Sequence, residues 1–167
     1  MKNIKLTREE KLLDTAIAYD HGDAKRIQHF IKVYTFAKMI GIREGLSVEM
    51  LNILSAAAIL HDIGIHKAEE LYGKCDGKLQ EELGPDIART LLTQNDYTDQ
   101  EADRICFLIR HHHTYTEIDG MDYRILVEAD FLVNFYEDEF DEKAAAVMEE
   151  RIFRTEAGKE LLHQLIR

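Results

Sequence analysis

Apolar residues recur along the chain at spacings of three and four positions, which is the pattern of helices with one buried face. This spacing differs from the period of two that is typical of strands. One proline and nine glycines leave few interruptions between the periodic segments. The sequence therefore predicts an all-α fold.

Residues that cap helix N-termini mark where the predicted helices begin. The first helix is expected to run from Thr7, which forms a capping box with Glu10, to about Tyr19. Further helices are expected to begin at these positions: Asp23, Ser47, Thr98 and Asp122. The helix that opens at Ser47 is expected to end at Gly64, and the tail is expected to add one or two more helices.

The segment KAEELYGKCDGK, residues 67–78, is the most loop-like part of the chain because two glycines lie among three lysines. It is expected to form a loop that acts as a lid or as a substrate loop. Helical periodicity resumes in LQEELGPDIARTLL.

Composition places the chain among folded globular proteins, with 46% hydrophobic and 32% charged residues. A length of 167 residues fits one domain, since single hydrophobic cores span about 100 to 200 residues. No apolar run approaches the roughly 20 residues that a membrane-spanning helix needs, and MKNIKLTREE lacks an apolar signal core. We therefore expect a cytoplasmic protein in which Cys75 and Cys106, without CxxC spacing, remain reduced thiols.

The charge of the chain limits its classes of partner. Lys and Arg number 21 against 32 Asp and Glu, which gives a formal net charge of -11 at pH 7. Nucleic acids and anionic membranes are bound by basic surfaces, so neither is an expected partner. An anionic small molecule would need positive charge gathered locally at its site.

Four polar residues interrupt strongly apolar helical segments. His61 and Asp62 stand together at the end of NILSAAAILHD, His29 lies in RIQHFIKVYTFA, and Asp130 lies in ILVEADFLVN. Burying such groups without partners is costly, so something must satisfy them. For each residue alone, a hydrogen-bonded structural role is the more common explanation. Together, imidazoles and carboxylates from three helices favour a site for Mn, Fe, Co, Ni or Zn.

The ordered set of His, His-Asp and a distant Asp resembles the HD-domain superfamily of metal-dependent phosphohydrolases. The resemblance is carried by His29, His61, Asp62 and Asp130, and by the phrases AAAILHDIG, GPDIARTLL, IRHHHT and VEADFLVN. It implies a helical bundle with a divalent metal ion at its centre, held by these four residues.

The same resemblance implies a single HD-type domain over residues 1–167, with a core at about 23–136 and a C-terminal helical tail at 137–167. The implied activity is hydrolysis of a small phosphorylated metabolite, a nucleotide or a dinucleoside polyphosphate, by a metal-activated water. Asp62 would hold the metal and orient the attacking hydroxide.

Three successive histidines, His111, His112 and His113, fan around a helix end, so at most two can face one site. By resemblance to dinuclear HD proteins, His112 and His113 are expected to help bind a second metal, with His111 outside the site. Dinuclear relatives often carry a further histidine just ahead of the helix GPDIARTLL, where this chain has QEE. Either Glu81 or Glu82 supplies an oxygen ligand instead, or both are solvated caps. The number of ions, one or two, stays open.

Positive charge for a phosphate is expected from Lys67, Lys74, Lys78 or Arg110, although such side chains are usually just solvated.

A second hypothesis is a degenerate HD domain that binds a nucleotide as a sensor or regulatory module without turnover. A third is a helical interaction module whose histidines are incidental. The sequence does not select the substrate, the native metal or the oligomeric state.

Overall fold

The computed structural model describes residues 5–166, which form nine α-helices and no β-strand. The prediction of an all-α fold is confirmed. In chain order, the helices are α1 (Arg8–Tyr19), α2 (Ala24–Arg43), α3 (Val48–Leu60), α4 (Ile65–Tyr72), α5 (Gly77–Gln94), α6 (Asp99–His111), α7 (Met121–Glu137), α8 (Glu142–Arg151) and α9 (Glu156–Leu165).

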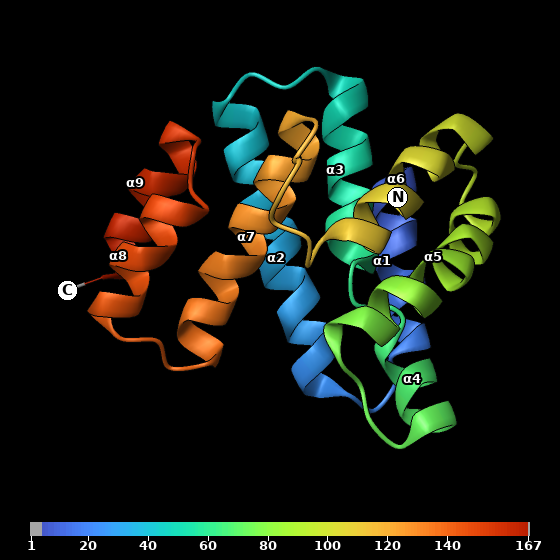
Figure 1. The fold of residues 1–167 in the computed structure, drawn as a ribbon. Helices are drawn as coiled ribbons and strands as arrows, with labels where there is room; N and C mark the ends of the chain where they lie inside the picture. Colours follow the sequence, from blue (N-terminus) through green and yellow to red (C-terminus); the bar gives the residue numbers. More distant parts are fainter. Residues whose placement is uncertain (1–4, 167) are drawn as a thin grey trace.

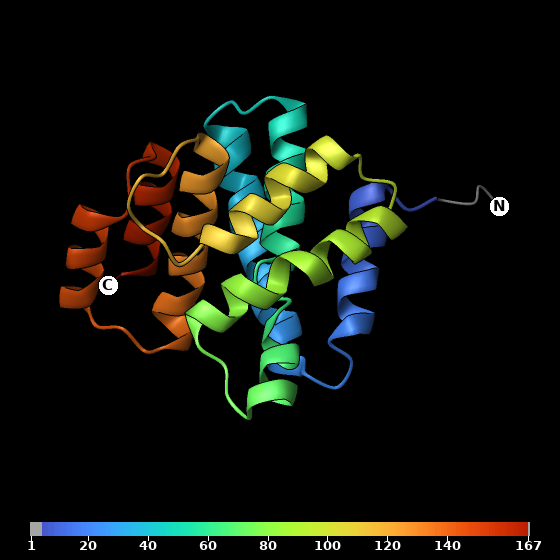
Figure 2. The ribbon, with the colours of Figure 1, turned by 45° about the vertical axis from the view of Figure 1, so that its right-hand side comes forward.

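The centre of the bundle is built from α2, α3 and α7 (Figure 1). Helices α5 and α6 lie side by side on one flank, and α8 and α9 lie on the flank opposite α1 (Figure 2). Every residue of α3 from Leu54 to Leu60 is buried, because α1, α2, α6 and α7 all pack around this helix. Its run of alanines allows this close approach from several sides.

The apolar character of α3 has a second consequence. The stretch Val48–Tyr72 is long and apolar enough to cross a membrane by composition, yet 61% of its most apolar window is buried inside the fold. Burial of this kind is what the central helix of a globular domain requires.

Four predicted N-terminal caps are confirmed. In each, the side chain accepts a hydrogen bond from the backbone N–H three residues later: Thr7, Asp23, Ser47 and Thr98. These caps satisfy N–H groups that the first turn of a helix leaves without partners.

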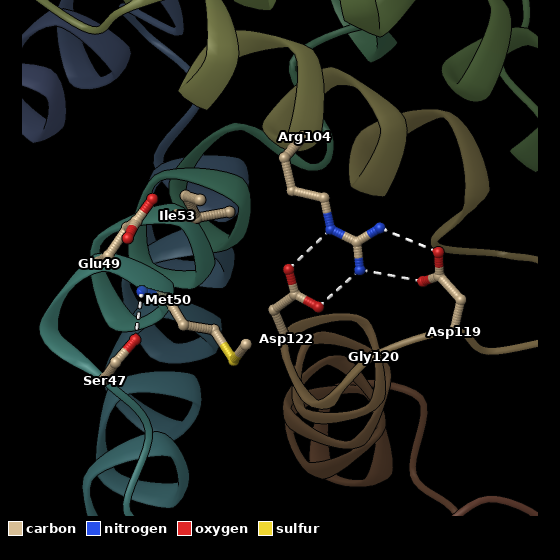
Figure 3. Close-up of a pocket in the computed structure, with 8 residues that line it drawn as sticks. All are labelled: Ser47, Glu49, Met50, Ile53, Arg104, Asp119, Gly120 and Asp122. Atoms are coloured by element: carbon tan, nitrogen blue, oxygen red, sulfur yellow. Dashed lines mark hydrogen bonds and ion pairs between the residues drawn. The ribbon is translucent and has the colours of Figure 1, made fainter.

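Asp122 has a different role from the predicted one. Helix α7 begins one residue earlier, after Gly120, and the Asp122 carboxylate instead lies 2.8 Å and 2.7 Å from Arg104 Nε and Nη2 of α6 (Figure 3). The guanidinium also binds Asp119, at 2.9 Å and 3.1 Å (Figure 3). A Cβ at Gly120 would lie 2.8 Å from Arg104 Nη2, so a larger residue here would displace the guanidinium from this position. This ion pair fixes the start of α7 against α6.

The predicted loop at residues 67–78 is wrong over its first half. Helix α3 ends at Leu60, a short turn follows, and α4 runs from Ile65 to Tyr72, before Gly73, which has a φ of +67°. The residues KAEEL are strong helix formers, and the first of the two glycines, Gly73, lies only at the end of this helix. Only residues 73–76 remain outside helices, since Asp76 caps α5 at Gly77.

A close backbone contact places the turn after α3. A Cβ at Gly64 would lie 2.8 Å from Gly84 N and 2.9 Å from Gln80 O, so the turn rests directly on the backbone of α5. Two glycines at this crossing allow a separation that side chains would prevent. The contact brings the residues just before Gly64 close to the first turns of α5.

A buried carboxylate ties the C-terminal helices to α7. Glu128 is fully buried, and its Oε1 accepts hydrogen bonds from the backbone N–H groups of Arg154 and Thr155 at 2.7 Å and 3.1 Å. Its Oε2 accepts the hydroxyl of Thr155, which also caps α9. The apolar cluster beneath extends from Leu12 to Leu162.

We expect Glu128→Ala to lower the free energy of unfolding by about 2 to 4 kcal/mol, because it leaves buried N–H groups without an acceptor. Urea unfolding followed by circular dichroism measures the change. The exposed Glu150→Ala in α8 is the control and should change the free energy by less than about 0.5 kcal/mol. Equal effects of the two substitutions would show that the buried hydrogen bonds contribute nothing.

Candidate metal centre

Six side chains from four parts of the bundle converge between α2, α3, α6 and α7. Each offers a nitrogen or a carboxylate oxygen. These atoms form two groups, and within each group all of them lie within 4.8 Å of one another. The first group is His29, His61 and Asp130, and the second is Asp62, His112 and His113. The structure thus gathers all six residues that the sequence proposes as ligands.

The first group is compact and buried. Nε2 of His29 lies 3.2 Å from Nε2 of His61 and 3.3 Å from Oδ1 of Asp130, and the His61 nitrogen lies 3.6 Å from the same oxygen. The three residues are 0 to 8% exposed. They come from α2, from the residue that ends α3, and from α7, so this group ties together the three central helices.

The opposite ring nitrogen of each central histidine is fixed by an acceptor. His61 Nδ1 lies 2.8 Å from Ala58 O, and His112 Nδ1 lies 2.7 Å from Ile109 O. A carbonyl oxygen can only accept, so both Nδ1 atoms donate. His29 Nδ1 likewise donates to the Glu137 carboxylate at 2.7 Å. In the neutral rings, all three Nε2 atoms are therefore acceptors.

This arrangement fits a metal ion. With both Nδ1 atoms donating, the neutral rings of His29 and His61 place two nitrogen lone pairs 3.2 Å apart without a proton between them. Asp130 Oδ1 and His112 Nε2 are also buried without a hydrogen-bond partner among the described residues. A cation in the first group would satisfy His29, His61 and Asp130, and one in the second group would satisfy His112. The N and O donors suit a transition-metal ion.

Asp62 joins the two groups. Its Oδ2 lies 3.4 Å from the Nε2 atoms of both His29 and His61, whereas its Oδ1 lies 3.5 Å from Nε2 of His112. One oxygen therefore faces each group. This is the arrangement that would let a single carboxylate contact two ions.

The second group is completed by residues of α5. Gln80 Oε1 lies 2.8 Å from His113 Nε2, and Glu81 Oε1 accepts the backbone N–H of His113 at 3.0 Å. Glu81 therefore lies beside the site and holds the backbone of a candidate ligand, while Glu82 is exposed. His111 binds Phe107 O through Nδ1 at 2.7 Å and belongs to neither group.

The electrostatics of the site keep its carboxylates ionised. Burial alone raises the pKa of Asp62 and Asp130, but the facing histidines outweigh it and hold both values below the usual range. Burial likewise disfavours protonation of His61, but Asp62 and Asp130 raise its pKa to about 9. Burial and the neighbouring His112 lower the pKa of His113 to about 4. Metal binding must then displace protons, mainly from the first group.

A cavity of about 220 Å³ opens onto His29 and Asp62. Its cations are Lys25 and Arg26, which sequence reasoning did not select. Arg26 is held 3.1 Å from Asp23 and 2.8 Å from Glu69. The sequence did contain a signal for Arg26: it lies three residues before His29 and therefore on the same face of the helix.

None of the cations proposed from the sequence lines this cavity. Lys67 lies on α4 and pairs with Glu70 at 2.9 Å, since the segment is helical. The other three side chains are exposed. Lys74 precedes α5, Lys78 lies in the first turn of α5, and Arg110 lies in the last turn of α6.

Comparison with known proteins decides the family. The family model described as HD domain matches residues 26–163. The chain belongs to the HD-domain family. A solved structure described as a predicted HD superfamily hydrolase from an uncultured Thermotogales bacterium is similar to this HD domain, with 26% identity and a TM-score of 0.65. The alignment covers 93% of this chain and 83% of the other. No curated protein matches this sequence.

Family membership and geometry agree at a coarse level. Members of this superfamily are generally hydrolases, and the His and Asp cluster of this HD domain is able to hold a divalent metal. A separate cavity of about 410 Å³ at the start of α7 has no such cluster among residues 5–166, and its Arg104 binds both Asp119 and Asp122 (Figure 3). The candidate site of the HD domain is therefore the cavity at His29.

We expect Glu137→Gln to weaken metal binding about 10- to 100-fold, because this carboxylate orients His29 and makes its ring a better ligand. Burial raises the pKa of Glu137, but Lys32 and His29 outweigh it and lower the pKa, so the group is ionised. Titration with Zn²⁺ or Mn²⁺ against a chelator measures the affinity. The neighbouring Glu139→Gln is the control, and an equal loss there would contradict the role of Glu137.

Asp20 makes the stability of the HD domain depend on pH. Burial raises its pKa to about 6, in spite of His66 Nε2 at 3.4 Å and nearby Arg26. The folded state then holds this proton more tightly than the unfolded chain, whose pKa is near 3.8. The free energy of unfolding therefore falls as pH rises from about 4 to about 6.

We expect Asp20→Asn to remove this loss. The variant should match the wild type near pH 4 and exceed it above about pH 7, by up to about 3 kcal/mol. Urea unfolding of metal-free protein at several pH values tests this. Asp14→Asn, which changes an exposed carboxylate, should show no such trend. A constant difference at every pH would sink the assignment.

Proposed function

We propose that this HD domain is a metal-dependent phosphohydrolase that acts on a small phosphorylated metabolite of the nucleotide or dinucleoside polyphosphate class. The observation that carries the proposal is Asp62, whose two oxygens face two groups of buried donors at the floor of a cavity. Lys25 and Arg26 on the wall of that cavity supply positive charge for a phosphate.

The donors favour Mn, Fe, Co, Ni or Zn, and the two groups support two ions rather than one. A divalent ion held here would supply an acidified water and polarise a phosphoryl oxygen. His29, His61 and Asp130 would hold one ion, and His112 and His113 would contribute to the other. Asp62 would contact both.

The residues of the chain then perform the remaining work. Asp62 accepts a hydrogen bond from the attacking water and fixes its direction toward phosphorus. Arg26, clamped by Asp23 and Glu69, presents a fixed guanidinium to the phosphate oxygens, and Lys25 adds a second charge. Glu81 and Gln80 keep His113 in position.

We further propose that the C-terminal helices belong to the same HD-type domain as the core. The Glu128 hydrogen bonds and the apolar cluster that reaches Leu162 support this. A small-molecule substrate and a cytoplasmic location complete the proposal, on the net charge of -11 and the burial of α3.

The test is elemental analysis of protein purified without a His-tag and without oxygen. We expect one or two equivalents of Mn, Fe, Co, Ni or Zn in the wild type, and about a 100-fold loss of phosphatase rate in Asp62→Asn together with loss of metal. Asp14→Asn, exposed on α1, is the matched control and should keep both metal and rate.

Three outcomes separate the hypotheses. Metal together with turnover supports the phosphohydrolase. Metal or nucleotide binding that raises the thermal midpoint, without turnover of any phosphoester, would favour the sensor. Metal-free protein that cannot be reloaded would sink both and favour an interaction module.

A further inference from the structure

We propose that the substrate is a phosphate monoester of a hydroxyl-rich alcohol, such as a sugar or nucleoside, and that the site discriminates against chains of two or more phosphates. This inference rests on the proposed metal-dependent phosphohydrolase. Within the small phosphorylated metabolites it favours monoesters, and it excludes the dinucleoside polyphosphates. Its basis is the charge, size and polarity of the cavity wall beyond the metal-binding residues.

The wall offers little free positive charge. Arg26 is already shared between Asp23 and Glu69, at 3.1 Å and 2.8 Å. Glu137 is likewise paired, with Lys32 at 2.5 Å and with His29 at 2.7 Å. The charges of these paired side chains largely cancel, so they contribute little net charge to the lining of the cavity.

Two charged side chains of the wall have no such partner among the described residues. Lys25 and Asp138 are both exposed, and neither takes part in a side-chain hydrogen bond or ion pair there. One positive and one negative charge remain for a ligand. A phosphoryl group bound at the metal centre is served by Arg26 and Lys25, but a second or third phosphate would meet the unpaired carboxylate of Asp138 and no further cation.

Anionic groups without counter-charges are costly to bring into a partly enclosed site. The chain as a whole adds to this, since its net charge is -11. The cavity wall therefore disfavours polyphosphates while leaving a single phosphate well neutralised.

The remaining polar atoms suit hydroxyl groups. Asn134 of α7 and Asp138, the residue that follows this helix, both line the cavity and offer carbonyl and carboxylate oxygens as acceptors. Hydroxyls of a sugar can donate to both. The volume of about 220 Å³ lies below the roughly 300 to 1,000 Å³ of typical ligand pockets, which fits a phosphate and one sugar ring.

The reaction balances without a second substrate. Water adds to phosphorus and the P–O bond to the alcohol breaks. One proton of the water ends on the leaving alkoxide, and the products are inorganic phosphate and the free alcohol.

The experiment compares kcat/KM of the metal-loaded wild-type protein for ribose 5-phosphate, AMP, ADP and ATP. Ethyl phosphate is the monoester without hydroxyls, and p-nitrophenyl phosphate reports phosphatase activity as such. We expect ADP and ATP to fall about 100-fold below the better of AMP and ribose 5-phosphate, and ethyl phosphate to fall about 10-fold below it. Preference for AMP identifies a nucleoside monophosphate and preference for ribose 5-phosphate a sugar phosphate; either supports the inference.

Asp138→Lys tests the wall directly. It should raise kcat/KM for ADP and ATP about 10-fold relative to AMP, because it replaces the repelling charge with an attracting one. Glu139→Lys is the matched control: it makes the same change in net charge on the next residue, which does not line the cavity.

The failures are distinguishable. ATP or ADP cleaved as well as the monophosphates overturns the inference while p-nitrophenyl phosphate turnover still supports a phosphohydrolase. Ethyl phosphate cleaved as well as ribose 5-phosphate overturns the part that concerns hydroxyls. If Asp138→Lys and Glu139→Lys change the ADP to AMP ratio equally, the wall does not set the preference. No turnover of any ester, p-nitrophenyl phosphate included, overturns the proposed function and the inference together.

Discussion

The packing of the central helices and the chemistry of the site both depend on three acceptor atoms that lie close together at the centre of the bundle. Nε2 of His29, Nε2 of His61 and Oδ1 of Asp130 lie 3.2 to 3.6 Å apart, while hydrogen bonds through Nδ1 fix both rings. Lone pairs at such distances repel unless a proton or a cation lies between them. Because the atoms come from three different helices, the packing of α2, α3 and α7 and the chemistry of the site depend on the same contact.

The ends of two helices make the rest of the site. His61 and His112 both follow the last turn of a helix, and each donates Nδ1–H to the carbonyl three residues earlier. That carbonyl has no partner within the helix, so one hydrogen bond satisfies the helix end and aims the other ring nitrogen into the site. The contact between Gly64 and Gly84 then holds the turn containing Asp62 on α5, next to the residues that position His113.

Charge is distributed differently at the floor and at the wall. The floor concentrates acceptors that call for a cation, whereas the wall pairs its own charges across α2, α4 and α7 through Arg26 and Glu137. A phosphate would thus be attracted to a cation held by the metal-binding residues. The other residues that line the cavity would add little further attraction. In our proposal, discrimination between substrates falls to side chains such as Lys25 and Asp138, which have no side-chain partner within residues 5–166.

The sequence by itself determined the helical fold, four of the helix starts and the residues that stand out chemically. Periodicity and capping act over a few residues, and a polar group inside an apolar helix is conspicuous without coordinates. Prediction from the sequence failed where local signals compete. Helix α4 forms in a segment with loop-like composition, and Asp122 binds Arg104 instead of capping α7. Only the tertiary structure decided that Asp62 faces both donor groups, that Glu137 supports His29, and that Lys25 and Arg26 line the cavity while Lys67, Lys74, Lys78 and Arg110 do not. These facts depend on how distant helices cross, and crossing is set by packing of the whole core rather than by any one segment.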